Sequence, residues 1–274
     1  MPGFDMHVHS TASDGTISVK EIILSAINIG LDGIAITDHD TIGGLEEAVE
    51  LGKKLNFPVI PGIELSTEVA EQEIHILGYF IDFNLSWVKE KLKALQNARQ
   101  TRIEKMVDKL RMLGYDVNKK EVFLYAGNGS VGRPHVARIL HEKGYTASLE
   151  DAFQRLIGRG CPAYVPRYKM TPEEAITFIT KAKGVPVLAH PGLSQADRLI
   201  LPLRDQGLKG IEVFHPDHSE SDEAKYLNMA KKNQLLVTGG SDFHGSNRSN
   251  LGSKYVPLSI WDELRGHLGT GHDD

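Results

Sequence analysis

Short apolar runs alternate with amphipathic segments along most of this chain, and this alternation is the feature that most constrains its fold. Apolar residues at helical spacing predict helices over 16–30, 44–56, 171–184, 199–207 and 222–234. Short, mostly apolar runs between them predict strands over 4–9, 31–41, 57–66, 73–81, 185–191, 208–214 and 235–245. Alternation of this kind predicts βα units around a parallel sheet.

Histidine and carboxylate side chains recur where the predicted strands end. Eight of the twelve histidines lie there, namely His7, His9, His39, His75, His190, His215, His218 and His244. They are accompanied by the acidic residues Asp14, Asp38, Asp40, Glu64 and Asp242. In a barrel, the C-terminal ends of different strands converge on one mouth, so these side chains would crowd together. The polar strand ends therefore favour a barrel over an open sheet.

Such a cluster predicts bound cations. Without them the carboxylates would repel one another and the buried imidazoles would lose solvation. Nitrogen and oxygen donors without sulfur suit Zn, Mn or Fe and are too rich in nitrogen for Mg or Ca. The donors outnumber the roughly three protein ligands of one catalytic zinc, so we expect two or three divalent ions. Clustered cations activate a bridging water and stabilise both oxygens of a displacement, which favours phosphoester hydrolysis.

The middle of the chain differs from the rest. Residues 98–165 are helical in pattern and basic, so we expect a helical insertion between barrel segments 1–97 and 166–274. Its stretch SVGRPH contains Arg133 and His135. We expect the insertion to close over the barrel mouth and to bring both side chains towards a phosphate, which a guanidinium binds through two parallel hydrogen bonds. The alternative is that GRPH only caps a helix.

Composition excludes several classes of protein. The net charge of −5 argues against broad electrostatic binding of long nucleic acid such as DNA. A single cysteine, Cys161, excludes both a disulfide framework within the chain and a thiolate metal cluster. No apolar run approaches the roughly 18–20 residues of a membrane span, and no secretion signal is recognisable. We therefore expect a cytoplasmic enzyme without membrane contact.

The motifs together resemble a known family. HVHSTASDGT, ITDHDT, GIELS, HILGY, LAHPG, GIEVFHPDH and GGSDFHG are similar to the motifs of the PHP (polymerase and histidinol phosphatase) family of metal-dependent phosphoesterases. The resemblance covers nearly all of the predicted barrel, in the order of the family. It implies a distorted (β/α)7 barrel with a trinuclear metal site.

The resemblance also implies ligands for each ion. The first ion would be held by His7, His9, Glu64 and Asp242. The second would use Asp14, His39 and His244, although many members have histidine at the position of Asp14. The third would use His75 and His190, with Glu64 bridging to the first.

The helical insertion followed by CPAYVPRY resembles PHP phosphatases that act on nucleotides and related enzymes that trim short RNA from the 5′ end. The expected activity is hydrolysis of nucleotide phosphate monoesters (a nucleoside 3′,5′-bisphosphate, an AMP-like nucleotide or a short 5′-phosphorylated RNA) by a metal-bridging hydroxide. The candidate catalytic residues are Asp14, His39 and His218, and the candidate substrate-binding residues are Arg133, His135, His215 and His218. A histidinol-phosphate phosphatase and a non-catalytic metal-binding module remain the alternatives.

Overall fold

The computed structural model describes residues 3–70, 72–126, 131–166, 169–245 and 249–268. The chain forms two compact units, one of Met1–Lys89 with Lys169–Asp274 and one of Glu90–Tyr168. These boundaries differ from the predicted 98 and 165. The first lies earlier because helix α3 (Ser86–Met112) begins well before the helical pattern recognised in the sequence.

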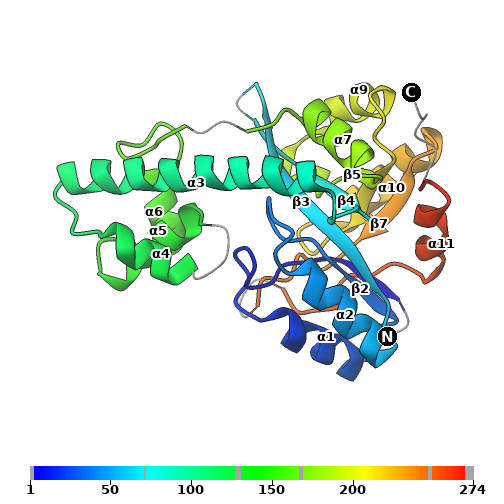
Figure 1. Cartoon of the computed structure of the whole chain (residues 1–274). Coiled ribbons are helices and arrows are strands. Elements are labelled where there is room, and N and C mark those ends of the chain that lie inside the picture. The colour runs from blue at the N-terminus through cyan, green and yellow to red at the C-terminus, as the bar shows by residue number, and fades with distance from the viewer. Residues whose placement is uncertain (1–2, 71, 127–130, 167–168, 246–248, 269–274) are drawn as a thin grey trace. The chain divides into compact units, whose positions relative to one another are not determined.

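Seven strands form the sheet of the first unit, and Figure 1 labels most of them. They are β1 (Phe4–Val8), β2 (Gly33–Ile36), β3 (Val59–Val69), β4 (Gln72–Tyr79), β5 (Val185–Leu188), β6 (Gly210–Phe214) and β7 (Leu236–Gly239). The helices of this unit are α1 (Val19–Asn28), α2 (Leu45–Leu55), α7 (Pro172–Lys181), α8 (Pro191–Ser194), α9 (Ile200–Asp205), α10 (Glu220–Lys232) and α11 (Ser259–Arg265), with a 3₁₀ turn, η2 (Asp197–Leu199). Each predicted strand and helix of this unit therefore has a counterpart, although β2 and β7 end five and six residues before the predicted ends at 41 and 245.

The strands are hydrogen-bonded in chain order from β1 to β7. A parallel bridge between Val8 and Phe243, with His9 N–H donating to Phe243 O at 2.8 Å, ties β1 to the segment after β7. The sheet is thus a nearly closed seven-stranded barrel, as the resemblance implied. Closure places β1 beside the segment that follows β7.

An all-parallel sheet, as the alternation alone predicted, is wrong at one strand. β4 runs antiparallel to both β3 and β5. Only residues 70 and 71 separate β3 from β4, whereas a parallel crossover needs about a dozen residues or more. The short connection therefore forces a hairpin, and the barrel is distorted at this strand.

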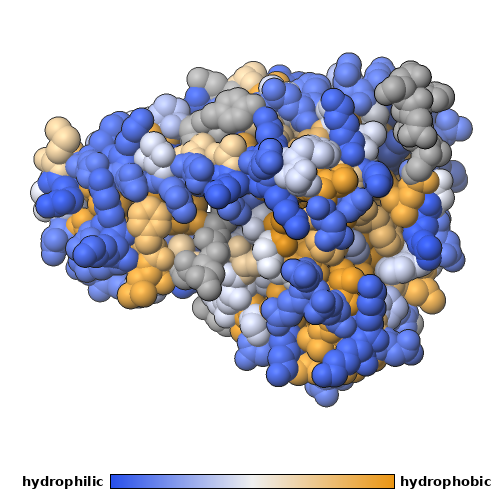
Figure 2. All heavy atoms as spheres, viewed as in Figure 1, coloured by the Kyte–Doolittle hydropathy of each residue, from blue (hydrophilic) through white to orange (hydrophobic). Residues whose placement is uncertain are grey.

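Apolar packing supports the barrel from inside and outside. Phe4, Met6, Ile60 and Leu77 are wholly buried in its core. Outside, α1 and α2 pack against each other, and their visible face is mostly hydrophilic (Figure 2). The α1 helix begins at a capping box in which Ser18 and Glu21 satisfy each other's backbone N–H groups.

The second unit is helical, as the sequence predicted for the insertion. It contains most of α3, then α4 (Lys119–Ala126), α5 (Arg133–Glu142), α6 (Leu149–Ala152) and a π-helical turn, η1 (Phe153–Ile157). Its own core includes Met106, Val107, Leu110, Val136 and Leu140, all fully buried. Within the described residues of the whole chain, no helix is both long and apolar enough to cross a membrane.

The backbone after β7 passes close to β1 at Gly240. A Cβ atom at this position would lie 2.3 Å from the backbone nitrogen of His7 and 2.5 Å from its Cβ. Because such contacts force the backbone to shift, we expect Gly240→Ala to lower the free energy of unfolding by about 1–3 kcal/mol. Urea denaturation of chelator-treated protein measures this change.

Gly43→Ala is the matched control, because its added Cβ would come no closer than 3.4 Å to the nearest atom considered, Thr41 Oγ1. We expect this variant to change the free energy of unfolding by less than about 0.5 kcal/mol. Equal urea midpoints for the two variants would show that Gly240 does not lie against His7 as described.

Candidate metal centre

The first group of donor atoms comes from β1, β3 and the segment after β7. His7 lies in β1 and His9 follows it, and residues two apart on a strand face the same side. Glu64 lies inside β3 rather than at a strand end, because this strand continues to Val69. Both imidazoles and both carboxylates of the group, Glu64 and Asp242, are buried.

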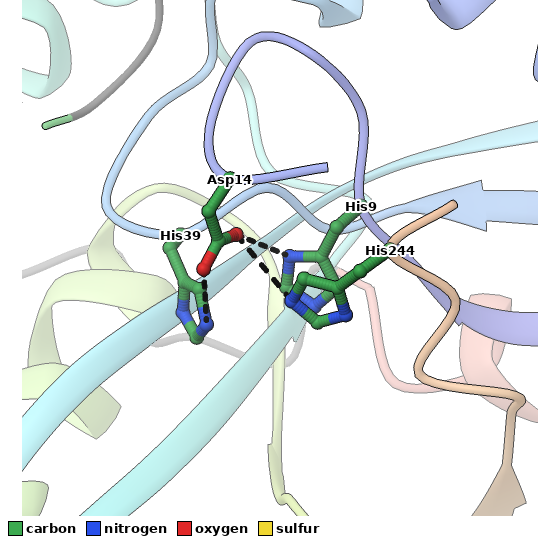
Figure 3. Close-up of side chains that lie close together, drawn as sticks. All are labelled: His9, Asp14, His39 and His244. Carbon is green, nitrogen blue, oxygen red and sulfur yellow. Dashed lines mark ion pairs between the residues drawn. The ribbon is translucent and has the colours of Figure 1, made fainter. Parts of the chain in front are cut away.

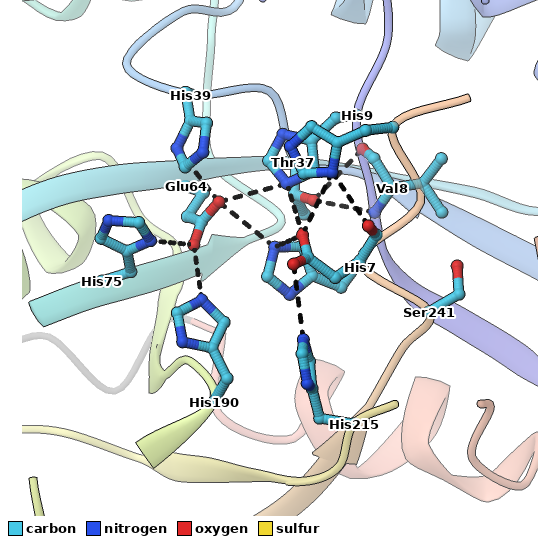
Figure 4. Close-up of polar contacts among 12 residues, drawn as sticks. His7, Val8, His9, Thr37, His39, Glu64, His75, His190, His215 and Ser241 are labelled. Carbon is cyan, nitrogen blue, oxygen red and sulfur yellow. Dashed lines mark hydrogen bonds and ion pairs between the residues drawn. The ribbon is translucent and has the colours of Figure 1, made fainter. Parts of the chain in front are cut away.

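The spacing of these four side chains fits one metal ion. The Nε2 atoms of His7 and His9 lie 3.2 and 3.1 Å from Glu64 Oε2 (Figure 4). The same nitrogens lie 3.4 and 3.3 Å from Asp242 Oδ1. A tetrahedral ion with bonds of about 2.0–2.1 Å holds its ligand atoms roughly 3.3 Å apart. The donors therefore already have the mutual spacing of ligands around a first-row ion.

A second group surrounds Asp14 (Figure 3). Asp14 Oδ1 lies 3.4 Å from His244 Nε2 and 3.8 Å from His9 Nδ1, while Asp14 Oδ2 lies 3.9 Å from His39 Nε2. The rings of His9 and His244 stack with centroids 4.0 Å apart. The predicted trio of Asp14, His39 and His244 is thus brought together, and the second nitrogen of His9 joins it.

The third group surrounds the other oxygen of Glu64. His75 Nδ1 lies 2.7 Å and His190 Nε2 lies 3.2 Å from Glu64 Oε1, and His39 Nδ1 lies 3.1 Å from Oε2. His75 was predicted to lie at the end of a strand. In the structure it lies within β4. Its antiparallel pairing with Ser66 nevertheless brings it to the edge where the parallel strands end.

Within the described part of the chain, most unpartnered buried polar side-chain atoms belong to this cluster. Among the described residues, ten buried side-chain nitrogen or oxygen atoms have no hydrogen-bond partner. Seven of them belong here: His7 Nε2, both nitrogens of His9, His39 Nδ1, Glu64 Oε2, His190 Nδ1 and His215 Nε2. Buried polar atoms nearly always have a partner. Converging donors without one fit divalent metal ions, and we conclude that the cluster has the donor set of such a site.

The electrostatics of the cluster couple protons to metal binding. Burial lowers the pKa of the His9 and His75 rings, but nearby carboxylates outweigh it and raise both pKa values to about 10. Burial likewise raises the pKa of Glu64 and Asp242, but the surrounding imidazoles hold both pKa values well below their usual range. At neutral pH the metal-free site therefore pairs carboxylates with the protonated rings of His9 and His75, whereas burial lowers the pKa of His39 to about 3 and holds the pKa of His190 below its ordinary value.

Strained backbone accompanies two of the candidate ligands. His190 has φ 24° and Asp242 has φ 49°, in the left-handed region that disfavours residues other than glycine. Such strain costs of order 1–3 kcal/mol per residue and persists only where surrounding contacts impose it. The barrel therefore holds these two residues in backbone conformations that are unfavourable for an unconstrained chain, and this sets the directions of their side chains.

The two predicted substrate-binding histidines of the barrel, His215 and His218, have partners within the first unit. His215 Nε2 lies 3.4 Å from Asp242 Oδ2, so this ring belongs to the donor cluster. His218 Nδ1 donates to Val213 O at 2.8 Å, and its Nε2 accepts from Gly192 N–H at 3.1 Å. Both nitrogens of His218 are thus bound to backbone, and its roles in catalysis and substrate binding stay predictions.

Arg133 and His135 begin helix α5 of the second unit. The guanidinium of Arg133 lies over the ring of Phe153, at 5.4 Å from its centroid, and His135 Nδ1 accepts from Gly132 N–H at 2.9 Å. His135 therefore contributes to the start of the helix, as the alternative reading of GRPH expected. The role of both residues in substrate binding stays a prediction, because they and the donor cluster belong to different units.

Sequence reasoning missed the carboxylates behind the cluster. Glu212 in β6 accepts from His7 Nδ1 at 2.9 Å, and Asp5 in β1 accepts from Ser241 N–H and Gly252 N–H, each at 2.8 Å. Both are fully buried. A charged residue inside an apolar strand, as in GIEVF, is the signal that could have identified Glu212.

One family model matches this chain. It is described as the PHP domain, and it matches residues 5–145, about half of the chain. The chain belongs to the PHP domain family. The resemblance inferred from the motifs is thereby confirmed.

Two curated proteins and one solved structure are similar to this chain over most of their length. The 3′,5′-nucleoside bisphosphate phosphatase of Chromobacterium violaceum is 32% identical, over 98% of this chain and 98% of its own. The 5′-3′ exoribonuclease Rnm of Salmonella typhimurium is 33% identical, over 88% of this chain and 85% of its own. A structure from Bifidobacterium adolescentis, described as a metal-dependent phosphoesterase, matches with a TM-score of 0.88 at 28% identity, covering 97% of this chain and 96% of that chain.

Metal binding should release protons from this PHP domain. The raised pKa values of His9 and His75 mean that both rings carry an extra proton well above pH 6.5, and a bound ion must displace it. We therefore expect apparent Zn²⁺ affinity to rise as pH increases from about 6 towards 9, because each binding event releases these protons. Calorimetric titrations in buffers of different ionisation enthalpy count the released protons. A proton count of zero at pH 7 would contradict the paired state described above.

Replacing Glu64 should remove metal from the site. Both of its oxygens face imidazole nitrogens of the cluster, so Glu64→Gln takes one oxygen donor and the negative charge from their centre. We expect the affinity for at least one ion to fall about 100-fold or more, beyond the 10–100-fold typical of lost ligand-supporting contacts. Metal analysis after dialysis against a chelator measures it. Glu68→Gln, four residues further along β3 and outside the three donor groups, should retain the wild-type metal content.

Proposed function

We propose that this protein is a metal-dependent phosphoesterase that hydrolyses phosphate monoesters of nucleotides. The observation that carries the proposal is the set of seven unpartnered buried nitrogen and oxygen atoms, which belong to Glu64 and to five histidines of the donor cluster. Nitrogen and oxygen donors in this ratio favour Mn, Zn or Fe. When bound, two or three such ions would supply positive charge for the phosphate oxygens and activate the attacking water.

The ligands proposed for each ion follow the three donor groups. His7, His9, Glu64 and Asp242 would hold one ion, and Asp14, His39 and His244 would hold a second. His75 and His190 would hold a third. Glu64 is suited to lie between ions, because one of its oxygens faces His7, His9 and His39 and the other faces His75 and His190.

The substrate proposal rests on the relatives. The nucleoside bisphosphate phosphatase matches this chain from end to end, while the exoribonuclease matches somewhat less of both chains. We therefore propose a nucleoside 3′,5′-bisphosphate as the substrate, with AMP-like nucleotides and short 5′-phosphorylated RNA as the related choices. Arg133 and His135 are the proposed phosphate contacts, since a guanidinium binds two phosphate oxygens at once.

Phosphate release tests the proposal. Chelator-stripped protein receives Mn²⁺ and then adenosine 3′,5′-bisphosphate, AMP, a short 5′-phosphorylated RNA or histidinol phosphate. We expect metal-dependent release from the nucleotides, fastest from the bisphosphate. Release from histidinol phosphate alone would overturn the substrate assignment. Bound metal without release from any compound would favour a non-catalytic metal-binding module.

The variant Arg133→Ala tests whether Arg133 binds the substrate phosphate. Losing a hydrogen bond to a charged group costs about 1.5–3 kcal/mol, so kcat/KM for the nucleotide should fall roughly 10- to 100-fold. Arg138→Ala is the matched control, because Arg138 lies on the same helix and packs over the Tyr125 ring. Equal kcat/KM values for the two variants would remove Arg133 from the proposal.

A further inference from the structure

Glu212 is a fully buried carboxylate that contacts two of the candidate ligands. Its Oε1 accepts from His7 Nδ1 at 2.9 Å, and its Oε2 accepts from the backbone N–H of His190 at 2.8 Å. The side chain has no exposed surface. A buried carboxylate in a β-strand is costly unless such hydrogen bonds compensate for its lost solvation, so its two contacts need an explanation.

The contact with His7 selects one form of the imidazole. A carboxylate accepts hydrogen bonds, so Nδ1 of His7 must carry a proton. The other nitrogen, Nε2, is then free of a proton in the neutral ring and points at Glu64 Oε2 and Asp242 Oδ1, 3.2 and 3.4 Å away. Metal-binding histidines commonly have their second nitrogen held by a carboxylate in this way.

The contact with His190 acts on the backbone instead. His190 adopts φ 24° and ψ 61°, a conformation that the residue would not choose alone. Its N–H is anchored by Glu212, and its ring nitrogen Nε2 reaches Glu64 Oε1 at 3.2 Å. The hydrogen bond therefore helps to impose the turn that directs this ring towards the cluster.

We propose that Glu212 is a positioning residue of the metal centre, whose single carboxylate fixes the His7 ring and the His190 backbone together. Only a carboxylate can accept from both donors. A glutamine would turn an amide N–H towards one of them, either repelling the His190 N–H or reversing the protonation of His7. This inference rests on the metal-dependent function proposed above.

Glu212→Gln tests the proposal at nearly constant volume. Wild type, Glu212→Gln and the control Glu21→Gln are stripped with chelator and titrated with Zn²⁺ against a chromophoric chelator. The control replaces an exposed carboxylate of the α1 capping box, where glutamine also functions. We expect Glu212→Gln to weaken Zn²⁺ binding roughly 10- to 100-fold, with Glu21→Gln matching wild type. Visible spectra of the Co²⁺ forms should change in Glu212→Gln alone.

A measurement on wild type keeps the proposal testable even where Glu212→Gln does not fold. Long-range ¹H–¹⁵N spectra of the Zn²⁺-loaded protein report which nitrogen of each histidine carries the proton, with His7→Gln assigning the His7 signals. We expect a proton on Nδ1 of His7. A proton on Nε2, or metal at Nδ1, would overturn the inference.

The outcomes separate this inference from the function on which it rests. A wild-type protein that binds no Zn²⁺ would overturn the proposed function. Tight Zn²⁺ binding by wild type together with equal affinity and an unchanged Co²⁺ spectrum in Glu212→Gln would overturn the positioning role alone.

Discussion

The burial of one carboxylate among five imidazoles is the interaction on which this structure depends. Glu64 is 1% exposed, and its two oxygens face His7, His9, His39, His75 and His190 at 2.7–3.2 Å. Neither the carboxylate nor the imidazoles can be removed from water at low cost without compensating charge. The cluster is therefore stable only as a charged, paired assembly, whether the positive charge is supplied by protons or by divalent ions.

That requirement explains the unusual features of the barrel around it. β3 extends past its pairing with β2, so that Glu64 lies inside the strand. The Glu64 backbone there pairs with the loop after β2, through the bridge between His39 and Glu64. β4 reverses direction and brings His75 to the same edge. Strained backbone at His190 and Asp242 aims the remaining side chains inward. Each deviation from a regular parallel barrel thus directs a donor atom towards Glu64.

A layer of hydrogen bonds behind the donors holds them in place. Asp5 anchors the segment that precedes Asp242, and Glu212 anchors His7 and His190. These carboxylates are buried among backbone N–H groups, where they keep their acceptor capacity occupied. The catalytic possibilities of a PHP domain depend on such support, because ligand atoms displaced by even a few tenths of an ångström bind an ion less well.

The sequence by itself determined the element types, the barrel and the chemistry of the donors. The repeated placement of His9, His39, His190 and Asp242 after apolar runs was sufficient, because strand ends of a barrel must converge. The tertiary structure decided strand direction and side-chain contacts, which the periodicity of the sequence does not predict. In the structure β4 is antiparallel to its neighbours, and the two oxygens of Glu64 face different histidines. Both nitrogens of His218 form hydrogen bonds with backbone. The tertiary structure also revealed Glu212, which contacts a residue 205 positions away. These features depend on pairings distant in sequence, and only the folded barrel brings those partners together.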